Sequence, residues 1–162
     1  MDPLSMGESK LERHSTGRAL ASAVLLEKVV RDAYEKRQSS EVQPLQWSIL
    51  RYLSMSSEDR STISWIAGFL GITHAPVVRA VKTLQQRNYV ALHPNPADGR
   101  SKIVRLSEQG LAQLNDDPLL AVAERIEMLA EDEKMALISS VKQLISNRNF
   151  EGEESDGVDP SR

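Results

Sequence analysis

The sequence predicts a mainly α fold with a small β-wing, in which a winged helix-turn-helix lobe is joined to a helical dimerisation lobe. Three observations predict this fold. Two segments with helical periodicity flank Gly71, which gives the order helix, turn, helix. Two short segments rich in β-branched residues follow, joined by a loop of turn-forming residues. Amphipathic helical patterns lie on both sides of this block, before residue 44 and after residue 107.

The N-terminal part of the chain is expected to contribute one long helix. Residues 1–15 are polar and show little periodicity, so we expect them to be disordered. From residue 17 to about residue 38 the apolar side chains recur at helical spacing, as Leu20, Val24 and Val30 illustrate.

A second helix is expected over residues 45–55. Pro44 precedes it, and a first helical turn tolerates proline because its N–H would have no partner there. Trp47, Leu50 and Leu53 supply the apolar content. A polar gap at residues 56–61 then separates this helix from the next.

The helix-turn-helix itself is predicted over residues 62–88. Its first helix, 62–70, ends at Gly71, since glycine is common just beyond a helix C-terminus. Thr73 is a good N-cap for the second helix. Pro76 then falls at the third helical position, where the missing N–H breaks no intrahelical bond. Four apolar residues are expected to anchor this second helix: Val77, Val78, Val81 and Leu84.

A two-stranded wing should follow. Residues 89–93 and 102–106 are short and rich in β-branched and apolar residues. The intervening loop holds two prolines and the turn signal Asp98-Gly99, so we expect an antiparallel pair. The loop is longer than a tight hairpin needs and should project.

The C-terminal part is predicted to be helical again. Ser107 and Glu108 favour a helix start, and Pro118 should interrupt that helix before residues 119–129. The last helix is expected over 131–148, where apolar residues recur at helical spacing. Residues 150–162 are acidic and contain glycine and proline, which indicates a disordered tail.

The predicted organisation is therefore a single domain over residues 16–149. The helix-turn-helix and wing would occupy about 44–107, and the dimerisation helices about 17–38 and 108–149.

Charge is concentrated in the middle of the chain. Residues 60–106 contain seven basic residues and one acidic residue, a net charge of +6 in a protein whose formal net charge is −3. A basic segment inside an acidic protein is typical of a polyanion-binding surface.

Composition excludes several other classes of function. The chain has no cysteine, which excludes disulfides, thiolate metal sites and thiol catalysis. Three scattered histidines do not make a metal cluster, and there is no Gly-rich phosphate loop or nucleophile motif, so we expect neither an enzyme nor a cofactor. No segment approaches the length of a membrane span, which predicts a soluble, cytoplasmic protein.

The second helix of the helix-turn-helix is short enough to lie in a DNA major groove. Its N-terminus presents free N–H groups suited to phosphate. In the wing, Arg100 and Lys102 could reach the adjacent minor groove or backbone, and Asp98 could orient the Arg100 guanidinium by a bidentate pair. The candidate DNA-binding residues are Thr73, His74, Ala75, Pro76, Arg79, Lys82, Asp98, Arg100 and Lys102.

Several motifs carry a family resemblance. They are Ile66-Ala67 with Leu70-Gly71-Ile72, the run from Pro76 to Leu84, and Asp98-Gly99-Arg100-Ser101-Lys102 followed by Val104 to Gly110. In these motifs the chain resembles the MarR family (multiple antibiotic resistance regulators) of bacterial transcription regulators. The likeness covers about residues 17–149. The family commonly has glycine at the position of Asn88.

The resemblance implies a homodimer that binds double-stranded DNA, with recognition helices in successive major grooves and wings at the flanks. It also implies a small aromatic or anionic effector, bound between the dimerisation and DNA-binding lobes. Trp47, Tyr52 and Trp65 could line such a pocket, although core packing is the more common role of aromatic residues. A ligand-responsive repressor on a pseudo-palindromic operator is the leading interpretation. The alternative is a winged-helix module for protein or RNA contact without an effector switch.

Overall fold

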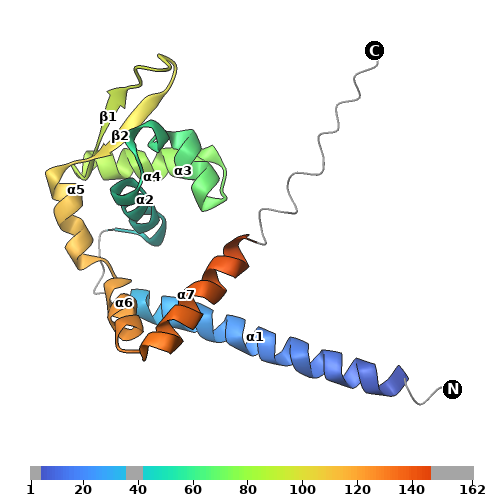
Figure 1. The fold of residues 1–162 in the computed structure, drawn as a ribbon. Helices are drawn as coiled ribbons and strands as arrows, with labels where there is room; N and C mark the ends of the chain where they lie inside the picture. Colours follow the sequence, from blue (N-terminus) through green and yellow to red (C-terminus); the bar gives the residue numbers. More distant parts are fainter. Residues whose placement is uncertain (1–4, 36–41, 147–162) are drawn as a thin grey trace, which may run out of the picture. The chain divides into compact units, whose positions relative to one another are not determined.

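The computed structural model describes residues 5–35 and 42–146. Seven α-helices, two 3-10 turns and a two-stranded antiparallel sheet follow one another in this part of the chain (Figure 1). The chain divides into two compact units, Met1–Leu120 and Ala121–Arg162. The elements are α1 (Ser5–Glu35), α2 (Pro44–Met55), η1 (Glu58–Arg60), α3 (Ile63–Leu70), α4 (His74–Gln86), β1 (Val90–Pro94), β2 (Lys102–Leu106), α5 (Glu108–Gln113), η2 (Leu114–Asp116), α6 (Leu120–Glu127) and α7 (Glu131–Ser146). The mainly α fold with a small β-wing is confirmed.

The core of the first unit lies where α2, α3, α4 and the wing meet. Its largest fully buried side chains include Trp47 and Leu50 from α2, Ile66 from α3 and Leu84 from α4. These residues come from the helical faces that the periodicity predicts. Because interior side chains are packed closely, this core fixes the orientation of α4 relative to the wing.

Local sequence explains the turn between α3 and α4. The Thr62 hydroxyl accepts a hydrogen bond from the Trp65 N–H and caps α3. Gly71 ends α3 in the left-handed region, with φ 63°, which costs glycine little. Asn88 adopts φ 59° just after α4, and asparagine is among the few non-glycine residues that tolerate this conformation. The chain can therefore turn into the wing without glycine.

The wing is wider than the sequence predicts. β1 and β2 pair antiparallel from Val90 opposite Leu106 to Pro94 opposite Lys102. Thr62 forms a further bridge to Ile103, and the Val104 N–H donates to the Ser61 carbonyl at 2.9 Å. The expected polar gap thus contains the η1 turn and ends in a short extended segment that joins the wing sheet.

α1 begins at Ser5 and not at Gly17, so the prediction of disorder over residues 1–15 is wrong from Ser5 onward. The physical reason is intrinsic propensity, since residues 8–13 (ESKLER) contain five strong helix formers and no β-branched residue. The helix ends at Glu35, and the rest of the predicted segment up to residue 38 lies outside the described residues.

A buried ion pair connects the chain after α5 to the core. The Arg51 guanidinium donates to both carboxylate oxygens of Asp117, at 2.5 Å and 2.7 Å, and to the Tyr34 hydroxyl of α1 at 2.8 Å. Burial lowers the pKa of Arg51, but the hydrogen bonds to Asp117 and Tyr34 outweigh it and raise the pKa above its ordinary value. Asp117 also accepts from the Leu119 N–H, next to Pro118. The helix predicted to run up to Pro118 ends earlier, because α5 stops at Gln113 and passes into the η2 turn.

The second unit contains most of α6 and all of α7. Lys134 of α7 bonds to Glu127 and Glu131, both at 3.0 Å. α7 ends at Ser146, and the predicted last residues of that helix lie outside the described part. So does the acidic segment 150–162. α7 exposes five large apolar side chains: Met135, Ile138, Val141, Leu144 and Ile145.

Candidate nucleic-acid interface

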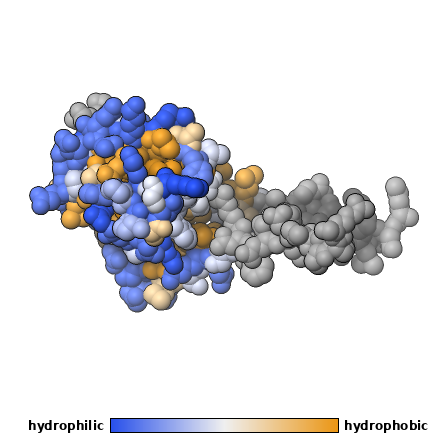
Figure 2. Space-filling view, turned by 90° about the horizontal axis from the view of Figure 1, so that it is seen from above, coloured by the Kyte–Doolittle hydropathy of each residue, from blue (hydrophilic) through white to orange (hydrophobic). Residues whose placement is uncertain are grey.

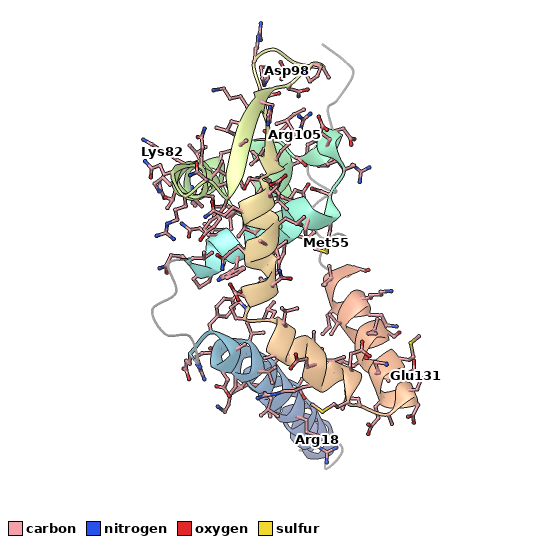
Figure 3. All side chains as sticks on the ribbon, turned by 90° about the vertical axis from the view of Figure 1, so that its left-hand side faces the viewer. Arg18, Met55, Lys82, Asp98, Arg105 and Glu131 are labelled. Atoms are coloured by element: carbon pink, nitrogen blue, oxygen red, sulfur yellow. The ribbon has the colours of Figure 1, made fainter. Side chains whose placement is uncertain are left out.

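One face of α4 is buried and the other is open to solvent. Leu84 and Val77 are fully buried, whereas Ala75, Arg79 and Lys82 are exposed. Helical spacing accounts for this division, since residues three or four positions apart share a face. Lys82 projects outward from α4 (Figure 3).

Val78 departs from the sequence prediction. It was expected to anchor α4, but it is 50% exposed on the same side as the basic residues. The reason is geometric. Val78 is three positions after exposed Ala75 and four before exposed Lys82, so it lies between them on the outer face.

The start of α4 is arranged as its sequence indicates, with one difference. Thr73 is the N-cap and Pro76 is the third residue of the helix, as predicted. The Thr73 side chain, however, makes no capping hydrogen bond. His74 instead lies beside α3, with its Nε2 atom 3.2 Å from the Ser64 hydroxyl.

The tip of the wing is a network of turn hydrogen bonds. The Asp98 carboxylate accepts from the Arg100 backbone N–H at 3.0 Å. The Asn95 side chain accepts from the Ala97 N–H and donates to the Ser101 hydroxyl. Asp98 therefore shapes the backbone of the tip (Figure 3), and the predicted bidentate contact with the Arg100 guanidinium is wrong. A short polar side chain two residues before a main-chain N–H prefers this local bond.

α4 and the wing border a shared groove of about 640 Å³. Ile63, Val78, Val81 and Leu92 supply its apolar surface. Four of the predicted DNA-binding residues line it, from both elements: His74 and Lys82 from α4, Arg100 and Lys102 from the wing. Thr73, Ala75, Pro76, Arg79 and Asp98 are not among the lining residues. The fold thus brings the basic side chains of helix and wing to one surface.

Two basic residues of the central segment have other roles. Arg105 on β2 forms an ion pair with Glu58 of η1. The Arg60 guanidinium lies over the Trp65 ring, 5.5 Å from its centroid. By contrast, Arg79, Lys82, Arg100 and Lys102 have no ion-pair partner within residues 17–35 and 42–146.

A second cavity of about 570 Å³ lies at the end of α2 and the start of α3. Tyr52 and Phe69 form a tilted aromatic pair with ring centroids 4.7 Å apart. Burial raises the pKa of Tyr52, whose hydroxyl donates to the Arg60 carbonyl at 2.6 Å. The remaining lining residues are Met55, Ser56, Ser57, Arg60, Trp65 and Gly68. Figure 2 shows a separate point about the surface: one face of the molecule is mostly hydrophilic but contains an apolar region.

The three aromatic residues proposed for a ligand pocket do not come together. Tyr52 and Trp65 line this second cavity, and Trp65 is 52% exposed. Trp47 is 1% exposed and belongs to the core instead. The residues that the sequence reasoning missed are Phe69, Arg60 and Met55, whose shared position depends on the α2–α3 connection.

Groups of three or more potential metal-ligating side chains do not occur in the described part of the chain. None of its helices combines the length and hydropathy needed to cross a bilayer.

Solved structures similar to this chain are MarR-type regulators. A MarR/EmrR family transcriptional regulator from Acinetobacter sp. ADP1 is 23% identical with a TM-score of 0.63, over 86% of this chain and 98% of the other. The PcaV transcriptional regulator from Streptomyces coelicolor, solved with its natural ligand, is 20% identical with a TM-score of 0.58, over 76% and 89%. A mutant of MepR from S. aureus bound to an oligodeoxyribonucleotide is 18% identical with a TM-score of 0.54, over 80% and 96%. At these identities the likeness establishes the fold.

The sequence comparisons address the family. No curated protein sequence matches the chain. The family model described as MarR family matches residues 40–101, which contain α2, α3, α4, β1 and the tip of the wing. Over residues 40–101 the chain is therefore similar to the MarR family, and its fold is that of solved MarR/EmrR-type transcriptional regulators.

Proposed function

We propose that this protein is a transcription regulator that binds duplex DNA through α4 and the wing. The observation that carries the proposal is the groove at which His74, Lys82, Arg100 and Lys102 converge from two separate elements. Clustered basic residues on one face are typical of a nucleic-acid interface. The MepR structure with a bound oligodeoxyribonucleotide supports this use of the fold.

The two elements would read different parts of the duplex. α4 has 13 residues, or about 20 Å at 1.5 Å per residue, and its exposed face can enter a major groove about 12 Å wide. The wing tip would then lie against the neighbouring backbone or minor groove. Phosphate contacts fix position, while base contacts specify sequence.

A mobility-shift experiment with genomic fragments tests the proposal directly. We expect specific fragments to be retarded in the presence of excess competitor DNA. Retardation of RNA alone, or of no nucleic acid at all, would instead favour the alternative of a module for RNA or protein contact.

Binding should fall steeply with salt. A dimer presents two copies of each of four exposed basic residues, eight charges in all: Arg79, Lys82, Arg100 and Lys102. If half of them contact phosphate, a plot of log affinity against log salt should have a slope of about −3 to −4, because each contact contributes about −0.9. Fluorescence anisotropy at several salt concentrations measures this slope.

A pair of variants sharpens the salt experiment. Lys82→Gln should make the slope shallower by up to about 1.8, since two phosphate contacts are lost per dimer. Arg105→Gln should leave the slope nearly unchanged, because Arg105 is already paired with Glu58. A salt-independent affinity, or equal effects of the two variants, would contradict this phosphate interface.

We further propose that the protein is a homodimer that binds a pseudo-palindromic site. α1 exposes the large apolar side chains of Leu20, Val24, Leu25, Leu26, Val29 and Val30, and α7 has a similar exposed set. Apolar surface of this extent favours burial against a partner. A second copy of the chain would bury the exposed apolar side chains of both helices. Two-fold symmetry would then place the two recognition helices about 34–36 Å apart, which is one turn of DNA.

Light scattering should therefore give about twice the chain mass of 18.0 kDa at micromolar concentration. Leu26→Glu should shift the mass toward the monomer, since a charge would then be buried in the interface. Lys28→Glu adds a carboxylate to the charged face of the same helix, where Lys28 pairs with Asp32, and should remain dimeric. A wild-type mass near 18.0 kDa would exclude both the dimer and the palindrome.

The cavity at the α2–α3 junction is our candidate effector site, with a small aromatic anion as ligand. Its volume lies within the usual range for small-molecule sites. Trp65 and Phe69 offer aromatic faces, and Arg60 offers a cation. PcaV was solved with its natural ligand, which supports ligand binding by this fold. A repressor would be relieved if the ligand bound the DNA-incompetent state more tightly.

Tryptophan fluorescence can test this site because the chain has only two tryptophans, one in the core and one at the cavity. Titration with benzoate and related aromatic carboxylates should quench the fluorescence and release DNA. Trp65→Phe should abolish the quenching, because Trp47 is buried in the core and is not one of the residues that line the cavity. Neither quenching nor DNA release across the set of compounds, or undiminished quenching in Trp65→Phe, would refute the effector site.

A further inference from the structure

An exposed valine stands in the middle of the proposed reading face of α4. Val78 is 50% exposed, with Ala75 one turn before it and Lys82 one turn after it on the same side. The other apolar residues of the helix beyond its first turn, Val77, Ala80, Val81 and Leu84, are all buried. Val78 is therefore not part of the core, and it contributes instead to the groove between α4 and the wing.

Helix stability does not favour valine at this position. Its β-branched side chain has a lower helix propensity than the long polar residues usual at exposed helical sites. Valine cannot contact phosphate by hydrogen bond or charge, unlike its neighbours Arg79 and Lys82. What valine offers is a rigid apolar surface at the edge of the groove between α4 and the wing.

We propose that Val78 determines specificity by contacting the C5-methyl group of a thymine in the major groove. The inference rests on the proposed binding of duplex DNA by α4. Among base edges in the major groove, the thymine methyl is the apolar feature that distinguishes one base pair from another. Val78 lies next to Arg79 in sequence and one turn before Lys82 on the exposed side of α4, so a base edge that it contacts lies beside cationic side chains that can set the register on phosphate.

The test removes single methyl groups from both partners. A binding site is first selected from a pool of random duplexes, and each thymine in a half-site is then replaced by deoxyuridine, which lacks only the methyl group. With the wild-type protein, one such replacement in one half-site should weaken binding about three- to fivefold, the effect of one buried methyl-sized group. With Val78→Ala, the same replacement should have almost no effect, and the affinity for the thymine site should already be reduced.

Ala75→Gly is the matched control, because it removes a methyl group from the same exposed face. It should lower affinity without changing the deoxyuridine effect at the position assigned to Val78. Thermal melting should show that Val78→Ala stays folded, as expected for a half-exposed side chain.

Three results would overturn the assignment. They are deoxyuridine effects equal in wild type and Val78→Ala at every position, no deoxyuridine effect at all, or coupling to Ala75→Gly alone. Each of these leaves DNA binding itself intact. Failure to select any duplex would be different, since it would refute the proposed function on which the inference rests.

Discussion

Arg100→Ala should weaken operator binding by about 30-fold or more while leaving the fold and the dimer intact. Arg100 is exposed at the tip of the wing, where it supports no core contact. Each good groove or phosphate contact contributes about 1–3 kcal/mol, and a dimer would lose two of them, about 2–6 kcal/mol. Anisotropy with a labelled operator, at fixed salt, measures the loss.

Two further variants separate a contact with DNA from a change in the wing. Arg105→Ala removes an arginine from the same wing, but one that pairs with Glu58, so its effect on affinity should be small. Asp98→Ala removes the acceptor for the Arg100 N–H and loosens the tip, and it should fall between the other two. Wild-type affinity in a folded Arg100→Ala dimer would remove the wing from the proposed mechanism.

The helix-turn-helix could be predicted from the sequence because its signals are local. Gly71 ends α3 in the left-handed region and Pro76 occupies the third position of α4, as residue type alone indicates. In each case a backbone constraint acts within one turn of the residue that causes it.

The partners of charged residues could not be predicted in the same way. Arg105 pairs with Glu58, 47 positions earlier, and Arg51 pairs with Asp117, 66 positions later. Ser61 and Thr62 join the wing through β2, which the sequence of a polar segment does not indicate. Such contacts depend on how α2, η1 and the wing pack, and that arrangement is set by the whole core.

Aromatic residues show the same division between local and tertiary information. Trp47, Tyr52 and Trp65 are near one another in sequence, which suggested one site. Helical geometry separates them, since Trp47 faces the core while Tyr52 and Trp65 face the cavity. Large apolar side chains are equally suited to a core or a pocket, so composition alone does not decide between them.

Gly110→Ala should lower the stability of the fold far more than the same substitution at Gly17, Gly68 or Gly99, where an added Cβ would meet nothing within 4 Å. Gly110 is buried in the first turn of α5, and a Cβ atom there would lie 1.9 Å from the Tyr89 carbonyl oxygen and 2.8 Å from the carbonyl carbon. Those are backbone atoms, so no side chain can rotate away. Overpacking typically costs about 1–3 kcal/mol, and we expect Gly110→Ala to fall at the upper end because the clash is with backbone atoms.

The close approach has a local cause. The Ser107 hydroxyl accepts from the Gly110 N–H at 2.9 Å and donates to the Asn88 carbonyl, while the Ser107 N–H donates to the Tyr89 carbonyl at 3.0 Å. These bonds hold the start of α5 against the entrance of the wing. Relieving the clash would break these hydrogen bonds.

Gly68→Ala is the matched control, and its expected effect has the opposite sign. Gly68 is an exposed residue of α3, and a Cβ atom there would meet nothing within 4 Å. Alanine should therefore stabilise the helix by about 0.5–1 kcal/mol, because glycine loses more backbone freedom on folding. Urea unfolding of the two variants, at equal protein concentration, should move the midpoints in opposite directions. A Gly110→Ala midpoint equal to that of wild type would mean that α5 does not pack on the wing entrance as described.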